Sequence, residues 1–182
     1  MARIDATEQL CNEHREAEAA FAIFEQTVDQ QTRRQLAQTL VKALSIHAGV
    51  EELVLYPVIR DRVPGGPEMI DHALEEHQEV KEILVELDRA AGKDNADVAL
   101  LVQRLKKAVL EHVAEEEGQV FPRLRDVLSR EELRDLGEKL MEAEQHAPTH
   151  PHPHAPNRPP ANKVADMAAF VLDKARDLVS KR

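Results

Sequence analysis

Two segments of this sequence place a glutamate four residues after a histidine. The first runs from His47 to Glu51, and the second from His112 to Glu116. On an α-helix, positions i and i+4 lie on one face and about one turn apart, so each imidazole and its carboxylate point toward the same spot. Imidazole nitrogens and carboxylate oxygens are ligands for divalent metals. The spacing therefore predicts a metal site built from both segments.

Two further histidines repeat in the same order. A Glu-His pair, Glu13-His14, stands upstream of the first segment, and a second pair, Glu76-His77, stands upstream of the second. The chain therefore reads as two related helical hairpins, each supplying one histidine and then a His-x-x-x-Glu motif. The candidate metal ligands are His14, His47, Glu51, His77, His112 and Glu116.

The position of these groups within apolar helical stripes is the physical reason to expect a metal. An unpaired carboxylate or imidazole in a helical core costs several kcal/mol, and a divalent cation would offset that cost. One metal would be overfilled by six protein ligands, whereas two metals could take two histidines each and share both carboxylates as bridges. Two ferrous ions held in this way keep a net positive charge, which favours a bridging hydroxide or oxide and attracts small oxidants.

Neighbouring side chains are expected to have other roles. On an ideal α-helix Glu52, Glu115 and Glu117 point about 100° away from the ligand face, which predicts that they are solvated. Tyr56 and Phe121 occupy matching positions in the two copies and also point away from the ligands, which predicts packing. Cys11, one turn before His14, is expected to be a small core residue, and His72 is expected at the surface.

Other metal chemistries fit these residues less well. The sequence has no His-Glu-x-x-His motif, which argues against a zinc protease, and its single cysteine excludes zinc fingers and iron–sulfur clusters. Ferritin-like di-iron bundles use Glu-x-x-His. Three residues before the four candidate histidines, this chain has instead Cys11, Leu44, Leu74 and Val109.

Long amphipathic helices must position the ligands. Apolar residues recur at helical spacing over about 5–28, 32–60 and 96–127, over a third helix between turns at 61–67 and 92–95, and over a shorter fifth helix from Ser129 to about Gln145. Val28 is expected at the buried end of the first stripe. Val54 and Val58 are expected on the buried face beyond Glu51.

Four long helices with short connections predict an all-α, up-down-up-down four-helix bundle built from two αα-hairpin repeats. Asp5 with Glu8, and Ser129 with Glu132, are placed as capping boxes at two helix starts. Each copy also carries a proline ten residues after its histidine, Pro57 and Pro122, which predicts a kink or a helix end beyond the site.

The remaining chain differs in kind from this bundle. Residues 146–161 are rich in proline and histidine, which predicts an extended polyproline strap or a disordered linker whose histidines are solvated or bind loose metal. Residues 162–182 form a slightly basic amphipathic helix, with Leu178 and Val179 on its apolar face. It is expected to dock on the bundle; a second subunit or a membrane surface stays open. The predicted organisation is a bundle at 1–145, a linker at 146–161 and a C-terminal helix at 162–182.

Composition limits the partners and the compartment. A formal net charge of −10 disfavours nucleic acid, because binding to phosphates needs a concentrated cationic face. The single cysteine excludes an intramolecular disulfide, and no apolar run approaches the ~18 residues of a membrane span. The N-terminus has no apolar leader segment, so we expect a cytoplasmic protein without a transmembrane segment.

At these residues the sequence resembles the hemerythrin-like family, the HHE cation-binding domain. The ordered set His14, His47-x-x-x-Glu51, His77, His112-x-x-x-Glu116, with Tyr-Pro or Phe-Pro following each glutamate, follows the family pattern over about residues 7–127. The resemblance implies a non-haem di-iron centre, oxo- or hydroxo-bridged, in a four-helix bundle. His14 and His47 would hold one iron, His77 and His112 the other, and both glutamates would bridge.

The chain also departs from the oxygen-carrying members of that family. Those proteins resemble it but have a second histidine on the third helix, where this sequence has Ala73, and they use a longer His-to-Asp spacing in the last motif. With four histidines both irons should keep open positions, which favours redox chemistry on peroxide over oxygen carriage. Some bacterial members with this ligand set are catalase-like.

Two classes of function stay open at this point. The first is an enzyme that decomposes hydrogen peroxide, and the second is a module that binds, senses or stores O₂, NO or iron without turnover. Manganese or zinc could occupy the same ligands, since supply and geometry select the metal more than affinity does.

Overall fold

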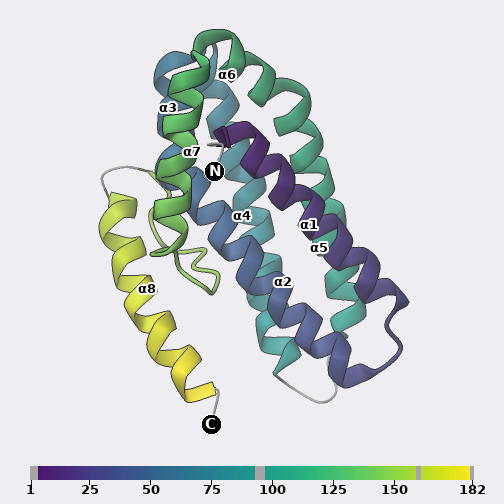
Figure 1. The fold of residues 1–182 in the computed structure, drawn as a ribbon. Coiled ribbons are helices and arrows are strands. Elements are labelled where there is room, and N and C mark those ends of the chain that lie inside the picture. The colour runs from purple at the N-terminus through teal and green to yellow at the C-terminus, as the bar shows by residue number, and fades with distance from the viewer. Residues whose placement is uncertain (1–3, 93–96, 159–160, 181–182) are drawn as a thin grey trace.

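The computed structural model of the chain describes residues 4–92, 97–158 and 161–180, without the side chains of residues 163 and 178–180. Four helical rods run antiparallel along the molecule (Figure 1). Within the described residues every regular element is helical, which confirms the all-α bundle. The rods are α1 (Ala6–Gln26), α2 (Gln30–Val50) continued by η1 (Glu51–Leu55) and α3 (Tyr56–Arg62), α4 (Gly66–Ala91), and α5 (Val98–Glu115) continued by η2 (Glu116–Val120) and α6 (Phe121–Val127).

Short turns and capping side chains set the ends of these rods. Gly65 adopts φ of +76°, a left-handed conformation that glycine reaches without a steric penalty, just before α4 begins. The turn expected at 92–95 lies mostly outside the described residues. Asp5 caps α1 by accepting a hydrogen bond from the amide of Glu8. α1 ends at Gln26, so Val28 lies beyond it and is 86% exposed; the prediction that it is buried was wrong.

A fifth helix, α7 (Arg130–Glu144), packs against α1 and the site end of the second rod (Figure 1). It starts with the predicted capping box, because the Ser129 hydroxyl accepts from the Glu132 amide and the Glu132 carboxylate accepts from the Ser129 amide. Gly137 allows the close approach, since an added Cβ would lie 2.7 Å from the Ile4 carbonyl oxygen.

The hydrophobic core is divided in two. One cluster gathers α3, α6 and α7 around Leu55, Ile59, Phe121 and Leu140, and the other fills the opposite end of the bundle around Phe21, Leu40, Leu84 and Leu105. The candidate ligands are buried among these apolar residues. The two cores pack the helices together on either side of the candidate ligands.

The helices carrying the glutamates widen before their prolines. The amide of Tyr56 donates to the carbonyl of Glu51, and the amide of Phe121 donates to the carbonyl of Glu116, so each turn spans five residues instead of four. A proline cannot donate to the helix and its ring crowds the carbonyl four residues earlier, which favours such a turn. The helix distortion was predicted beyond the site. It lies before each proline and begins at the candidate ligands Glu51 and Glu116.

The widened turn shifts the buried face by one residue. Leu55, Tyr56 and Ile59 are buried, whereas Val54 and Val58 are only half-buried. The prediction that Val54 and Val58 continue the buried face was wrong, because it assumed an unbroken α-helical period. The same shift determines which aromatic residues reach the metal site.

The strap and α8 (Ala161–Ser180) lie along one side of the bundle (Figure 1). The strap is held by the amides of Thr149 and His150, which donate to the Asp173 carboxylate at 2.9 and 3.0 Å. α8 reaches the bundle through Asn162, whose amide donates to the Glu52 carbonyl, and through Arg176, which pairs with Asp88. The expected apolar residues Leu178 and Val179 lie outside the described side chains. No helix in the described ranges is long and apolar enough to cross a membrane.

Candidate metal centre

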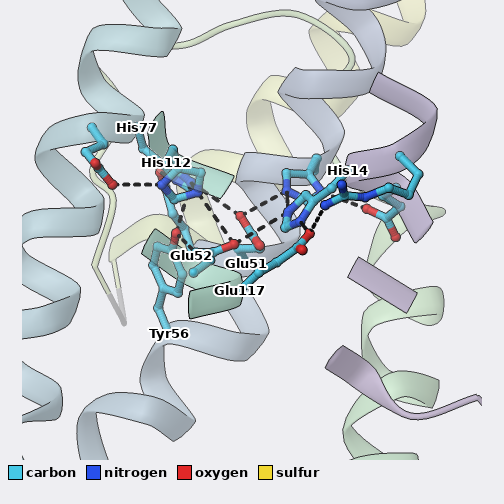
Figure 2. Close-up of polar contacts among 12 residues, drawn as sticks. His14, Glu51, Glu52, Tyr56, His77, His112 and Glu117 are labelled. Atoms are coloured by element: carbon cyan, nitrogen blue, oxygen red, sulfur yellow. Dashed lines mark hydrogen bonds and ion pairs between the residues drawn. The ribbon is translucent and has the colours of Figure 1, made fainter. Parts of the chain in front are cut away.

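The six candidate ligands converge at the middle of the bundle. His14 and His47 bring their Nε2 atoms within 3.2 Å of each other, and His77 and His112 bring theirs within 3.1 Å. Two side-chain groups there have the geometry to hold a metal, one of His14, His47, Glu51 and Glu116 and one of Glu51, His77 and His112. Figure 2 shows Glu51 lying between the His14 side and the His77 side.

The two glutamates join the halves. Glu51 Oε2 lies 3.4 Å from His47 Nε2 and 3.3 Å from His77 Nε2. Glu116 Oε2 lies 3.6 Å from both His14 Nε2 and His112 Nε2. Each carboxylate therefore faces one imidazole from each hairpin, which is the arrangement of a shared bridge.

A second set of carboxylates orients the imidazoles from outside. Two of these carboxylates lie in the same hairpin as the histidine that they bond: His47 Nδ1 bonds Glu13 at 2.7 Å, and His112 Nδ1 bonds Glu76 at 2.9 Å. The other two cross between hairpins, since His14 Nδ1 bonds Glu117 at 2.8 Å and His77 Nδ1 bonds Glu52 at 2.9 Å. The full set of outer carboxylates is Glu13, Glu52, Glu76 and Glu117.

Each outer carboxylate is placed to accept a hydrogen bond from the Nδ1 of its imidazole, which leaves Nε2 facing the other imidazole of the pair. Two neutral rings in this arrangement set their Nε2 lone pairs against each other at 3.2 and 3.1 Å, and a cation between them would relieve that repulsion. Although burial opposes it, the nearby charge of Glu116 raises the pKa of His112. Burial, together with the neighbouring imidazole, lowers the pKa of His14 and lowers that of His77 well below its usual value. The neutral imidazole that results is the metal-binding form.

Glu51 and Glu116, the candidate bridging residues, have oxygens without hydrogen-bond partners. Both side-chain oxygens of Glu51 and Oε2 of Glu116 are buried without a hydrogen-bond partner in the described part of the chain. Burial raises the pKa of Glu51 well above its ordinary value, and the nearby charge of Glu116 raises it further. Such groups are costly unless a cation lies among them, so the donor set fits a pair of divalent metals.

Tyr56 and Phe121 both reach the ligands, so the prediction that they point away was wrong. The Tyr56 hydroxyl lies 2.9 Å from His77 Nε2 and 3.3 Å from Glu116 Oε1, while the Phe121 ring stacks on His14 with centroids 6.0 Å apart (Figure 2 for Tyr56). Five residues make one widened turn, so residue i+5 returns to the face of the glutamate at residue i. Burial, then the charge of Glu116, raises the pKa of Tyr56 well above 10, so its hydroxyl stays protonated.

The flanking glutamates are also more involved than the helical period suggested. Glu52 is 5% exposed and both of its oxygens accept from Lys81 at 2.7 Å, so the prediction of a solvated side chain was wrong. Glu117 is partly exposed, and its carboxylate pairs with Arg15 as well as with His14. The repeated Glu-His and Glu-Glu doublets were the sequence signal for this outer set, since Glu13, Glu76, Glu52 and Glu117 occupy matching places in the two copies.

His72 and Cys11 are the other residues near the site for which the sequence made a prediction. His72 is exposed as expected and faces Glu115, which is half-buried, at 3.3 Å. With Glu76 these two could hold a cation at the surface. Cys11 packs partly buried against the core, as expected, and burial raises the pKa of its thiol.

A cavity of about 280 Å³ leads to the imidazoles between α1 and α2. Its lining includes His14, His47, His77 and His112, and neither Glu51 nor Glu116. Comparison with known protein families agrees with this geometry. The family model described as the hemerythrin HHE cation-binding domain matches residues 5–124 of the chain. The chain belongs to this family. Hemerythrin-like proteins bind metal, and this member has the histidine and glutamate groups to do so.

Two relatives match this hemerythrin-like chain over different shares of their own length. An uncharacterised hemerythrin-like protein of Schizosaccharomyces pombe is 30% identical over 96% of this chain and 86% of its own length. A protein of a Nostoc species named as a DNA nickase is 28% identical over 66% of this chain, but over only 33% of its own length. No solved structure matches the chain closely enough to be compared.

Proposed function

We propose that this hemerythrin-like chain is a non-haem di-iron protein that decomposes hydrogen peroxide. His14 and His47 would hold one iron, His77 and His112 the other, and Glu51 and Glu116 would bridge the two. The observation that supports this assignment is the pairing of four imidazoles whose Nε2 atoms meet at 3.2 and 3.1 Å, beside buried oxygens of Glu51 and Glu116 that have no hydrogen-bond partner in the described part of the chain. The bridging oxo or hydroxo group is part of the same proposal.

A pair of redox-active ions held there would supply two-electron chemistry for splitting the peroxide O–O bond. Four histidines and two carboxylates would leave open positions on such a pair, and Ala73 cannot add a ligand. Hydrogen peroxide could therefore reach the centre on the side that the cavity opens, where the lining holds the four imidazoles with Glu13 and Glu16 and neither Glu51 nor Glu116. Two molecules of peroxide give two of water and one of O₂.

The protein's own residues would hold the protons of this reaction. The Tyr56 hydroxyl is buried, protonated and within reach of both His77 Nε2 and Glu116 Oε1, so it can donate to a group bound between the halves. The outer carboxylates keep every Nδ1 protonated and each ring in place. The Phe121 ring stacks on His14 and packs against that imidazole.

Binding without turnover is the second candidate. The cavity beside the imidazoles is mostly apolar, so it would also admit O₂ or NO, and a protein that binds, senses or stores such ligands or iron would use the same six residues. Catalysis and binding differ in one measurable respect, which is repeated consumption of peroxide.

The experiment compares iron-loaded and zinc-loaded protein. We expect two irons per chain, absorption bands of an oxo-bridged iron pair, and O₂ evolution from added hydrogen peroxide over many turnovers. Zinc should fill the same ligands without evolving O₂, since it has no redox chemistry. A spectral change after peroxide with no O₂ beyond one equivalent would favour the binding module. A metal content near zero after loading would remove both candidates.

A further inference from the structure

The cavity between α1 and α2 is larger than hydrogen peroxide needs. It encloses about 280 Å³ and ends on the four imidazoles. A dry apolar cavity of roughly 150 Å³ is enough to hold benzene. The space above the candidate centre therefore fits an organic molecule with several carbon atoms.

Small side chains create this space. On α1, Ala17 and Ala20 face the cavity, and on α2 Ala43 and Ala48 do so. Ala20 is half-buried and Ala43 is exposed, so these two lie at the mouth, whereas Ala17 and Ala48 are buried. Alanine at four lining positions of two adjacent helices leaves a gap that leucine would fill.

The chemistry of the walls favours an apolar ligand. Leu40, Leu44, Val80, Val109 and Val113 form the buried part of the wall. The polar groups besides the imidazoles are Glu16 and Thr39, both exposed, and Glu13, which is half-buried and bonded to His47. Hydrogen peroxide would give up its hydrogen bonds to water along such walls, which costs free energy. A molecule with an apolar body gains by the same transfer.

We propose that this cavity binds small organic hydroperoxides, with the apolar body between α1 and α2 and the peroxide group at the imidazoles. This proposal rests on the proposed peroxide chemistry of the centre and names its preferred substrate class. An organic hydroperoxide ROOH takes up two electrons and two protons, its O–O bond breaks, and ROH and water form. Hydrogen peroxide supplies the two electrons and the two protons when it is oxidised to O₂. The sum is that ROOH and H₂O₂ give ROH, H₂O and O₂.

The test pairs two neighbouring alanines of α1. Ala20→Leu narrows the mouth, and Ala19→Leu places the same side chain on the exposed side of the same helix, so helix propensity changes equally. The ligand is 2-phenyl-2-propanol, an unreactive analogue of cumene hydroperoxide, added to the metal-loaded full chain. Binding is followed by NMR shifts of the Val80 and Val109 methyl groups and by thermal unfolding.

We expect the alcohol to shift those methyl signals and raise the melting temperature in the wild type. Its affinity should fall at least tenfold in Ala20→Leu and stay within twofold in Ala19→Leu. In assays, the ratio of kcat/KM for cumene hydroperoxide to that for hydrogen peroxide should fall at least tenfold in Ala20→Leu only. Equal behaviour of the two variants would overturn the proposal.

Two further outcomes separate this proposal from the proposed function. If xenon enters the cavity but the alcohol does not, while hydrogen peroxide is consumed, the cavity is a passage for small uncharged molecules and the hydroperoxide proposal fails alone. If the alcohol binds as expected but neither peroxide is consumed, the proposed peroxide chemistry fails, while the ligand class of the cavity is supported.

Discussion

The two halves of the candidate centre share their ligand geometry and differ in what surrounds it. The imidazole pairs are alike, at 3.2 and 3.1 Å between Nε2 atoms. The side chain of Glu117, the outer carboxylate of His14, is 29% exposed, and Phe121 stacks on that imidazole. The side chain of Glu52, the outer carboxylate of His77, is 6% exposed, and Tyr56 adds a hydroxyl there. Sequence duplication explains the common ligand positions. Unequal neighbours give the second half a buried charge pair and a proton donor that the first half lacks.

The largest expected effect comes from cutting the link between the halves. Glu51→Gln should empty both metal positions, because Glu51 Oε2 contacts one imidazole of each hairpin. Metal at about 1,000 times its Kd stabilises a protein by about 4 kcal/mol, and the variant should lose most of that gain. Without metal it should be more stable than the wild type, since a buried carboxylate with no hydrogen-bond partner is removed. Metal analysis and urea unfolding with and without metal measure both effects.

The matched control for this variant is Glu79→Gln, which neutralises an exposed glutamate on α4. It should keep two metals per chain and the full metal-linked stabilisation. One metal retained in Glu51→Gln would mean that each half binds its ion independently, and the bridging role would be lost.

The next effect separates the two aromatic neighbours. Tyr56→Phe should lower kcat for hydrogen peroxide by about 10- to 100-fold, because general acids contribute about 10²- to 10⁴-fold and water can replace part of this one. Metal content should not change. Phe121→Tyr places the same hydroxyl beside His14 and should not restore activity when combined with Tyr56→Phe, since the buried charge pair of Glu52 and Lys81 lies in the other half.

Steady-state kinetics on metal-matched samples measures this pair of variants. A structural role for Tyr56 would appear as loss of metal or of stability in Tyr56→Phe. Unchanged kcat in that variant, with its metal intact, would show that the hydroxyl takes no part in the reaction and that the halves are chemically equivalent.

Much of this architecture could be predicted from residue spacing. Apolar side chains at helical intervals specified four long helices, and the repeat of His14 and His47 by His77 and His112 specified where the helices meet. The fold and the family are confirmed. The assignment of these six residues as ligands stays a prediction, although the structure brings them together.

The neighbours of the site could not be predicted in the same way. An ideal helical period places Tyr56 and Phe121 off the ligand face, but the widened turns before Pro57 and Pro122 rotate these residues by an extra position. Such a turn reflects a competition between proline sterics and packing, which a hydrophobic pattern does not record. Glu52 is buried for another reason, because His77 and Lys81 of α4 and Asn162 of α8 bond it. The contact between the strap and Asp173 was missed for a related reason, since composition alone does not reveal a tertiary partner.

A smaller effect distinguishes the outer carboxylates of the two halves. Glu52→Gln should weaken metal binding by about 10- to 100-fold, the usual effect of removing a group that orients a ligand histidine. It also leaves the Lys81 ammonium without its buried partner. Glu117→Gln should cost less, since water can reach that position. Competition with a chelator at fixed pH gives both affinities, and equal losses would show that burial of the outer carboxylate is immaterial.

The smallest effect lies where α8 covers the second half. Burial, together with the charge of Glu52, raises the pKa of Asp166 from 3.8 to about 6. The folded protein therefore binds a proton more tightly than the unfolded chain, and stability falls as pH rises from about 4 through 6. Because Asp166 is only half-buried, solvent screening reduces the cost of its charge to about 1 kcal/mol.

Asp166→Asn should remove that cost. The variant should be about 1 kcal/mol more stable than the wild type at pH 8, and the difference should close below about pH 4, where the wild-type carboxyl is protonated in both states. Urea unfolding at the two pH values measures it, with Asp126→Asn, an exposed aspartate on α6, as the control. A difference that stays constant with pH would mean that Asp166 acts through its shape and hydrogen bonds, and that its charge does not oppose the buried Glu52 beside His77.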